Sequence, residues 1–256
     1  MMTHRQSVHE QFDPQAKAYL TSAVHAQGND LVRAQALVKQ AIPRTGVGLD
    51  IGCGAGHLSF ALSPLVSRIV ALDPSESMLA TVREAAGQKE LANIETKQGN
   101  AEELPFPDAS FCLVATRYSA HHWVGLDRAL AEMRRVLRPD GYILVIDVET
   151  FSDPLVDSHL QALELLHDRS HVRDRSEAEW RRHFQEAGFA LLEHSRWPVR
   201  LEFASWVATI RTPPSKVAMI REIQIEAPRE VREALAIEED GSFTIQTGLL
   251  WGCLDS

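Results

Sequence analysis

The feature that most constrains this chain is a glycine-rich run that directly follows a short apolar segment. Residues 47–51 are apolar except for Asp50, and glycine then stands at Gly52, Gly54 and Gly56. Glycine reaches backbone conformations that are closed to other residues. The spacing therefore predicts a tight turn in which backbone N–H groups and the first turn of a helix face a ligand.

The same alternation of short apolar stretches and amphipathic helices continues to residue 148. Strands are predicted over residues 47–51, 68–73, 94–98, 111–116 and 142–148. Helices are predicted over residues 56–65, after a cap at Ser75, and over 126–137. This order predicts an α/β fold with a mostly parallel sheet, right-handed crossovers and helices on both faces.

The regular alternation ends after residue 150. Residues 151–187 and 203–238 are expected to be helical, with a break at Pro213-Pro214, and strands are expected over 189–195 and 242–251. Residues 1–45 also have a helical pattern. We therefore expect an N-terminal helical lid (1–45), a ligand-binding α/β core (46–150), and a C-terminal part (151–256). The last part would supply acceptor-pocket or lid helices and the strands that close the same sheet.

Polar residues follow the second and third predicted strands. Asp73 ends the second strand, where its carboxylate can accept hydrogen bonds from both hydroxyls of a ribose; the alternative is a charge that only stabilises the next helix. Asn100, Ala101 and Glu102 follow the third strand, where they can contact an adenine edge or form a plain surface turn. His57 replaces the third glycine of the dinucleotide pattern G-x-G-x-x-G, which favours a different adenosyl ligand.

Four motifs in order carry a family resemblance: VGLDIGCGAGH, VALDPSESML, GNAEELPFPDASF and EMRRVLRPDG. Together they resemble the ubiquinone/menaquinone-biosynthesis C-methyltransferases, and RYSAHHW at 117–123 is similar to a poorly characterised bacterial branch of small methyltransferases. The resemblance covers roughly residues 10–150 and continues more loosely to the end. It implies a class I S-adenosyl-L-methionine-dependent methyltransferase that releases S-adenosyl-L-homocysteine. Its fold would be a Rossmann-like sheet of seven strands with an antiparallel last strand.

The resemblance also implies a set of cofactor-binding residues. The glycine loop would face the methionine moiety and the ribose, Asp73 would hold the ribose diol, and Met78 would pack against adenine. Arg117 would lie beneath the sulfonium and the amino-acid tail. The full set is Asp50, Gly52, Cys53, Gly54, Gly56, Asp73, Pro74, Met78, Asn100, Ala101, Glu102 and Arg117.

Two positions depart from the family pattern. Asn100 stands where the family usually has Asp, which keeps a hydrogen-bond acceptor but loses a charge. Cys112 stands where the family has a mainly structural Asp after Phe. The second departure therefore concerns the packing of the fourth strand more than cofactor binding.

The acceptor side is less specified than the cofactor side. Methyl transfer from a sulfonium mainly needs alignment, and a base is needed only where the acceptor loses a proton. His122, then His121 and Tyr118, are the candidate catalytic residues; the alternative is that one histidine packs internally and the other shapes the pocket. The candidate substrate-pocket residues are Tyr19, His25, Trp123, Trp206 and Arg211. Adjacent histidines on a regular element do not easily chelate one ion, so no metal is expected.

Composition limits the kinds of partner that the chain is expected to bind. A net charge of −9 argues against a nucleic-acid footprint, and no leader or stretch of ~18 apolar residues predicts a membrane segment. Three widely spaced cysteines fit reduced thiols. We expect a soluble cytoplasmic enzyme, a monomer or homodimer, that methylates a small planar or aromatic acceptor at C, O or N.

Two other functions remain compatible with the sequence. One is a non-catalytic S-adenosylmethionine-binding module. The other is a nicotinamide-dependent oxidoreductase, which His57 and the lack of a Tyr-x-x-x-Lys spacing disfavour. An RNA methyltransferase is disfavoured by the net charge.

Overall fold

Seven strands form one sheet in the computed structural model, which describes residues 3–12 and 28–255. The strands are β1 (Val47–Ile51), β2 (Arg68–Asp73), β3 (Ile94–Gln98), β4 (Phe111–Arg117), β5 (Leu137–Glu149), β6 (Phe189–Leu201) and β7 (Phe243–Leu254). Their order is β3-β2-β1-β4-β5-β7-β6. Strands β1 to β5 are mutually parallel, and β7 runs antiparallel to both of its neighbours. This confirms the predicted α/β sheet with an antiparallel last strand.

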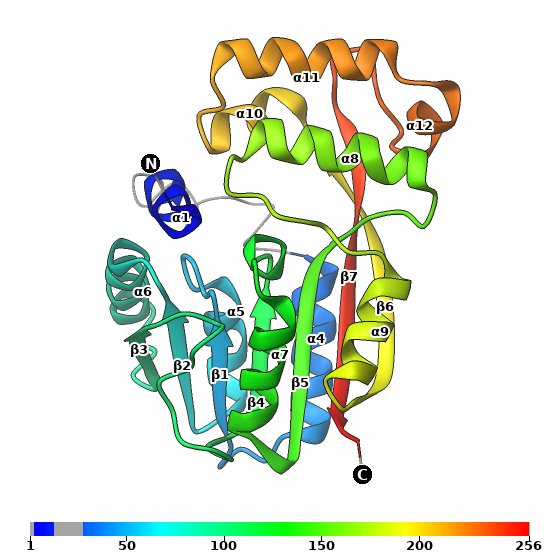
Figure 1. Cartoon of the computed structure of the whole chain (residues 1–256). Coiled ribbons are helices and arrows are strands. Elements are labelled where there is room, and N and C mark those ends of the chain that lie inside the picture. Colours follow the sequence, from blue (N-terminus) through cyan, green and yellow to red (C-terminus); the bar gives the residue numbers. More distant parts are fainter. Residues whose placement is uncertain (1–2, 13–27, 256) are drawn as a thin grey trace.

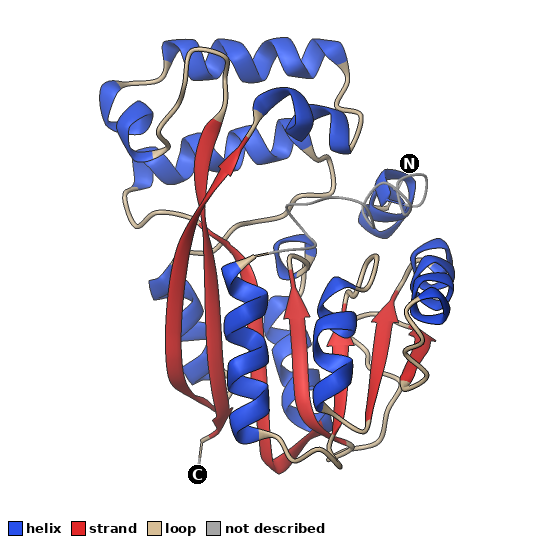
Figure 2. Cartoon of the chain, turned by 180° about the vertical axis from the view of Figure 1, so that it is seen from behind, coloured by secondary structure: helices blue, strands red, loops and turns tan. Residues whose placement is uncertain are grey.

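Helices cover both faces of the sheet (Figures 1 and 2). One face packs against α4 (Asn29–Ala41), α5 (His57–Leu62) and α6 (Glu76–Gln88), and the other against α7 (Leu126–Val136) and α9 (Glu177–Glu186). The alternation of the strands divides the core, since side chains two residues apart point to the same face. Leu49 and Ile51 face α7, whereas Leu113 and Ala115 face α4 and α5.

The amphipathic pattern explains why the covering helices bury one stripe each. In α7 the buried residues are three or four apart, as a helix period requires; they are Leu126, Ala129, Leu130, Met133 and Val136. Ser75 caps α6 by accepting the N–H of Met78 at 3.1 Å, which confirms the predicted cap.

A second layer of helices lies beyond the carboxyl ends of the strands (Figure 1). This helical lobe consists of α8 (Pro154–His167), α10 (Phe203–Thr209), α11 (Pro214–Glu226) and α12 (Arg229–Ala234), and has its own apolar core with the end of β5 and the start of β7. The short helix α1 (His4–Phe12) lies between this lobe and the sheet. Among the described residues, no helix is long and apolar enough to cross a bilayer.

The sequence-based boundaries were wrong in the C-terminal part. The helix expected over 151–187 is two helices separated by an irregular segment, because Ser176 and Glu179 form a capping box that starts α9 anew. Strand β6 continues past Pro198 to Leu201, although proline normally ends a strand prediction. It lies at the sheet edge, where a missing N–H costs no ladder hydrogen bond.

Gly248 in β7 generates a prediction about stability. A Cβ at this position would lie 2.2 Å from Oε1 of Glu149, whose buried carboxylate is hydrogen-bonded to His194 at 2.7 Å. We expect Gly248→Ala to lower the free energy of unfolding by ~1–3 kcal/mol, the cost of overpacking. Urea unfolding followed by circular dichroism measures the change.

Gly87 in α6 is the matched control. Apart from its chain neighbours and the backbone of its own helix, no described atom lies within 4 Å of a Cβ on Gly87. Gly87→Ala is therefore expected to raise the free energy of unfolding by ~0.5–1 kcal/mol, since alanine favours a helix. Equal unfolding midpoints for the two variants would contradict the packing argument.

Candidate active site

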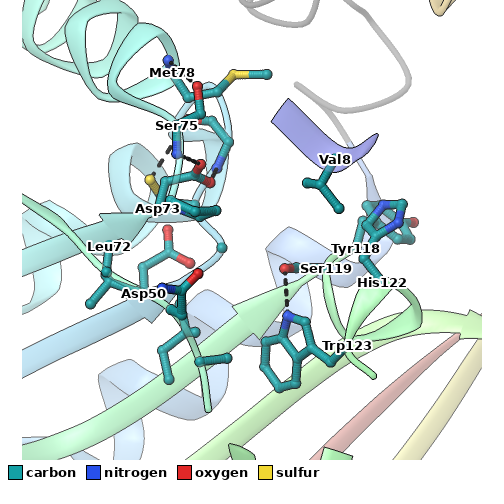
Figure 3. A pocket seen from close by; sticks show the side chains of 18 of the residues that line it. Val8, Asp50, Leu72, Asp73, Ser75, Met78, Tyr118, Ser119, His122 and Trp123 are labelled. Atoms are coloured by element: carbon teal, nitrogen blue, oxygen red, sulfur yellow. Dashed lines mark hydrogen bonds between the residues drawn. The ribbon is translucent and has the colours of Figure 1, made fainter. Parts of the chain in front are cut away.

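A cavity of about 490 Å³ opens at the carboxyl ends of β1, β2 and β4. It lies where the chain order reverses, because β1 is followed on one side by β2 and flanked on the other by β4. Parallel α/β sheets bind ligands at such a switch point. Figure 3 shows two facing walls: Asp50, Asp73, Ser75 and Met78 on one side, and a group from α1 and the end of β4 on the other. That second group is Val8, Tyr118, Ser119, His122 and Trp123.

The three glycines of the first wall have different reasons to be glycine. All have left-handed backbone conformations, with φ of +65° at Gly52, +50° at Gly54 and +90° at Gly56. A Cβ on Gly52 would lie 1.9 Å from Oγ of Ser119, and one on Gly56 would lie 2.8 Å from the Phe60 ring. A Cβ on Gly54 would meet no described atom within 4 Å. Gly54 therefore presents bare backbone to the cavity, whereas Gly52 and Gly56 serve packing.

Asp50 lies beneath this loop and is buried. Its Oδ2 accepts a hydrogen bond from Oγ of Ser59 at 2.6 Å, which ties the end of β1 to α5. Burial raises the pKa of Asp50 to about 7, and the Ser59 hydrogen bond opposes that rise. Its Oδ1 is buried and has no hydrogen-bond partner among the described residues, although Asp50 lines the cavity. The cavity thus contains an acceptor suited to a cationic or N–H donor.

Asp73 is oriented by the backbone on either side of it. Its Oδ2 accepts the N–H of Gly54 at 2.9 Å, and its Oδ1 accepts the N–H of Ser75 at 2.9 Å. The loop is also fixed to β2, because the N–H groups of Gly52 and Cys53 both donate to the carbonyl of Leu72. The glycine loop and the acidic residue predicted from separate motifs therefore form one hydrogen-bonded unit.

The segment after β3 completes this side of the cavity. Asn100, Ala101 and Glu102 line it, as do Pro74 and Met78. The Glu102 carboxylate accepts the N–H of Gly125 at 2.7 Å and so anchors the segment to the start of α7.

The end of β4 holds a buried ion pair that the sequence did not reveal. Nε of Arg117 lies 2.5 Å from Oδ2 of Asp30 in the first turn of α4, and both side chains are almost fully buried. Tyr118 follows with a φ of +51°, which is uncommon for a residue with a side chain. Its hydroxyl bonds to Oγ1 of Thr247, and burial raises the pKa of Tyr118 to about 12. The phenol therefore stays protonated near neutral pH.

His121 is not one of the described residues that line the cavity. It lies in the short helix η3 (Ala120–His122), and its Nδ1 is 2.5 Å from Oδ1 of Asp147, while its N–H donates to Oδ2 of the same residue. Burial by itself lowers the pKa of His121. The charge of Asp147 and its hydrogen bond outweigh burial and raise the pKa to about 9. His121 is thus a buried cation paired with a carboxylate.

His122 lines the cavity and, unlike His121, is neutral near neutral pH. Burial first, and then the neighbouring His121 cation, lower the pKa of His122 to about 4. The two rings lie 4.1 Å apart. Nδ1 of His122 is 3.1 Å from the carbonyl oxygen of Ser170. A carbonyl only accepts, so the hydrogen is on Nδ1 and the lone pair is on Nε2.

Helix α1 contributes cavity residues that no sequence signal predicted. Thr3, His4 and Val8 line the cavity, and Nε2 of His4 donates to the carbonyl of His122 at 3.0 Å. The helix also contacts the lobe, because Gln11 donates to the carbonyl of Ile210 and Glu10 pairs with Arg169. Its short polar sequence carries no motif. The cavity also takes Ser119 and Val124 from the segment after β4.

Two predicted pocket residues lie elsewhere. Trp206 stacks on His167 at 3.9 Å between ring centroids, packs against Phe243 in the lobe core, and is not among the described residues that line the cavity. Arg211 follows α10 and does not line the cavity among the described residues. Trp123 does line it and donates to Oγ of Ser119 at 3.1 Å. Tyr19 and His25 lie outside the described residues.

Comparison with known proteins identifies the family to which the chain belongs. A family model described as a methyltransferase domain matches residues 49–145. The uncharacterized protein YafE of Escherichia coli K12 is 43% identical over 193 residues, which is 75% of this chain and 93% of YafE. The uncharacterized methyltransferase YcgJ of Bacillus subtilis is 34% identical over 227 residues, or 88% of each chain. The chain belongs to this methyltransferase family.

Structure and sequence of further relatives agree with this assignment. The crystal structure of YcgJ matches the methyltransferase described here with a TM-score of 0.83 and 32% identity, over 89% of this chain and 98% of YcgJ. The ubiquinone/menaquinone biosynthesis C-methyltransferase UbiE of Hahella chejuensis is 40% identical over 112 residues, 42% of this chain and 45% of UbiE. The methyltransferase uses S-adenosyl-L-methionine as its methyl donor.

The cavity fits that cofactor on observations of its own. Asp50 has a buried oxygen without a described partner, Asp73 has a carboxylate at the cavity wall, and Gly54 leaves the volume of one Cβ empty. The amino-acid end, the ribose and the adenine of this cofactor need hydrogen-bonding groups of this kind and a close approach of the backbone.

Gly54 generates the first prediction about this site. A Cβ on Gly54 would enter the open volume of the cavity, so Gly54→Ala is expected to weaken S-adenosylhomocysteine binding by at least ~10-fold. The left-handed φ of +50° adds a stability cost of ~1–2 kcal/mol. Calorimetric titration of the folded variant measures the affinity, with Gly87→Ala as the control that retains wild-type binding. Unchanged affinity in Gly54→Ala would mean that the loop does not approach the cofactor.

The His121–Asp147 pair generates a prediction about pH. The folded pKa of His121 is about 9 against an ordinary 6.5, so its contribution to stability is full below pH 6.5 and is lost as pH rises through 9. His122 opposes this at lower pH, because its lowered pKa makes stability fall from pH 6.5 toward 4. Urea midpoints measured from pH 6 to 9.5 should therefore decline in the wild type.

His121→Asn should remove the part of that decline that comes from His121, most of which lies above the pKa of about 7 at which the buried carboxyl of Asp50 titrates. It should also destabilise the protein at pH 6.5 by ~3–5 kcal/mol, because it leaves the buried Asp147 carboxylate without its cation. Parallel pH profiles for the two proteins would contradict the ion pair.

Proposed function

We propose that this methyltransferase acts on a small, planar and largely uncharged acceptor at C, O or N, with His122 as the base where the acceptor must lose a proton. The observation that carries the proposal is the position, charge and tautomer of His122. It lines the cavity, is neutral near neutral pH, and has its lone pair on Nε2.

The shape of the cavity supports a small acceptor. A volume of about 490 Å³ lies toward the small end of ligand sites and has to contain the donor as well. The wall opposite Asp50 and Asp73 includes the apolar side chain of Val8 and the ring of Trp123, which suits a flat, largely apolar group. The chain's net charge of −9 gives no support to a nucleic-acid substrate.

Each part of the cofactor is assigned to particular residues of the cavity. We assign the methionine moiety to Asp50 and the glycine loop, the ribose hydroxyls to Asp73, and the adenine to Met78 with the segment from Asn100 to Glu102. Arg117 lies at the end of β4, where its guanidinium is held by Asp30 and packs 4.6 Å from the Tyr118 ring. The residues assigned to the cofactor therefore come from the carboxyl ends of β1 to β4.

The acceptor side is assigned to the remaining parts of the chain. The N-terminal segment supplies His4 and Val8, and the lobe supplies the segment that contacts His122. This arrangement supports an acceptor-side role for 151–256 and a lid role for α1 within the expected lid (1–45), next to the core (46–150). Helix α4, which the lid range also included, packs on the sheet and belongs with the core.

The chemistry asks little of the protein beyond alignment. When bound, S-adenosyl-L-methionine would supply an activated methyl group, and the electron pair of its carbon–sulfur bond would remain on sulfur. The acceptor's own electron pair forms the new bond to the methyl carbon, and its proton moves to Nε2 of His122. Tyr118 stays protonated and His121 stays charged, so neither competes as a base.

Mass spectrometry tests the proposed activity. The protein is incubated with methyl-labelled donor and a panel of phenols, heteroaromatic amines and enolisable carbonyl compounds, and labelled products are identified. Label in at least one class, with S-adenosylhomocysteine released in equal amount, is the expected result. Donor binding without turnover on the panel or on a metabolite extract would favour the non-catalytic binding module.

His122→Ala tests the base. We expect kcat to fall by ~10²–10⁴-fold while S-adenosylhomocysteine affinity stays within about twofold of wild type. The acidic limb of the wild-type pH–rate profile should lie near pH 4, because the pKa of His122 is about 4. His159→Ala, in the exposed part of α8, is the control. A raised KM with an unchanged kcat would assign His122 to acceptor binding alone.

A further inference from the structure

The segment between α8 and α9 encloses η3 from the lobe side. The N–H groups of Val172 and Arg173 both donate to the carbonyl of His121, at 2.9 and 3.1 Å. Nη1 of Arg175 donates to the carbonyl of Ala120 at 3.1 Å. The turn that carries His122 is therefore held by a segment more than forty residues away in the chain.

Asp168 begins this segment and has a fixed carboxylate. Its Oδ1 accepts the N–H of Ser170 at 2.7 Å and the Oγ–H of Ser170 at 2.6 Å. Its Oδ2 is 3.9 Å from Nε2 of His122. Asp168 and Ser170 are both buried, and Ser170 is fully so.

Ser170 contacts Nδ1 of His122 through both its side chain and its backbone. Its Oγ lies 3.3 Å from Nδ1 and donates its own hydrogen to Asp168. Its carbonyl oxygen accepts the Nδ1–H of His122 at 3.1 Å. Because the Asp168 carboxylate holds the N–H and hydroxyl of Ser170, it also fixes where this carbonyl points. One carboxylate thus acts on both nitrogens of the imidazole: on Nδ1 through Ser170, and on Nε2 by its charge.

We propose that Asp168 is the positioning residue of His122, and that Asp168 and Ser170 keep the imidazole in the Nδ1–H form and compensate its charge when Nε2 gains a proton. The inference rests on the proposed role of His122 as a base. It adds that this base is completed by the lobe and not by the α/β core that carries it.

Other charged groups around His122 do not fill this role. Asp147 is already engaged by the ring and backbone of His121, and His121 is a cation that opposes protonation of His122. His4 contacts the backbone carbonyl of His122, not its ring. Within residues 3–12 and 28–255, the charged and titratable groups near this turn are His121 on η3, Asp147 on β5, Glu164 on α8, His4 on α1, and Asp168, His171, Asp174 and Arg175 on the connecting segment.

The proton balance follows from this arrangement. The acceptor proton is taken by Nε2, so the neutral imidazole becomes an imidazolium with N–H groups at both nitrogens. Nδ1–H keeps its bond to Ser170, and the new charge lies beside the Asp168 carboxylate. The proton leaves to solvent from Nε2 once the methylated product has departed.

Two variants of Asp168 separate its two effects. Asp168→Asn retains an oxygen that can accept from Ser170 but removes the charge, whereas Asp168→Ala removes both. The matched control is Asp127→Asn. Asp127 forms a second Asp–His pair with His183, at 2.8 Å on the surface between α7 and α9, and does not line the cavity among the described residues.

Nitrogen-15 NMR of histidine-labelled full-length protein, saturated with S-adenosylhomocysteine at pH 7.5, tests the positioning without an acceptor. We expect His122 to be a single Nδ1–H tautomer in the wild type, in Asp168→Asn and in Asp127→Asn, and a mixture of tautomers in Asp168→Ala. A predominant Nε2–H tautomer in the wild type, or an unchanged tautomer in folded Asp168→Ala, would overturn the positioning role.

A double-mutant cycle tests the charge with the acceptor identified by mass spectrometry. Asp168→Asn is expected to lower kcat by ~10–100-fold with little change in KM, and to have no further effect in the His122→Ala background. An equal loss in both backgrounds would show that Asp168 acts independently of His122, which contradicts the proposal. An unchanged kcat in His122→Ala would instead refute the base itself, so the two failures are distinguishable.

Discussion

Much of the site depends on one buried carboxylate, that of Asp147 in β5. It accepts hydrogen bonds from the ring and the N–H of His121 and from the N–H of Val148. A buried ion pair contributes little net stability compared with apolar packing, but breaking it is costly. Here the pair fixes η3 between β4 and α7 and places a positive charge 4.1 Å, ring to ring, from His122. Burial and, after it, this neighbouring charge keep His122 neutral.

The α/β core could be predicted because its signals are local. Strands β1, β2, β4 and β5 each have an apolar run of their own, and the glycine loop and Asp73 each mark a strand end. The ends of β6 and β7 could not be predicted in this way. After Ser195, β6 continues with arginine at 196 and 200 and with Pro198, so nothing in the sequence separates a long edge strand from a loop.

The same difference between local and long-range signals applies to the residues of the site. Most of the residues expected to contact the cofactor line the cavity, because they lie at strand ends that a parallel sheet brings together. The contacts of the acceptor side join residues far apart in sequence, such as His4 with His122 and Ser170 with His122. These residues belong to short segments without periodicity. Trp206 shows the reverse case, since an aromatic residue in an amphipathic helix filled a core of the lobe.

The pairing of β5 with β7 has a consequence for how the chain can be divided. β5 pairs with β7 from Tyr142 with Cys253 to Glu149 with Gln246. A fragment cut at residue 150 would keep the whole glycine loop yet expose the N–H and C=O groups of that edge, a template for pairing with other chains and so for aggregation. The last two strands therefore act as a solubility cover for the core. Exchanging the lobe for that of a relative has to carry β6 and β7 along with the helices, because strand and lobe are one transferable piece.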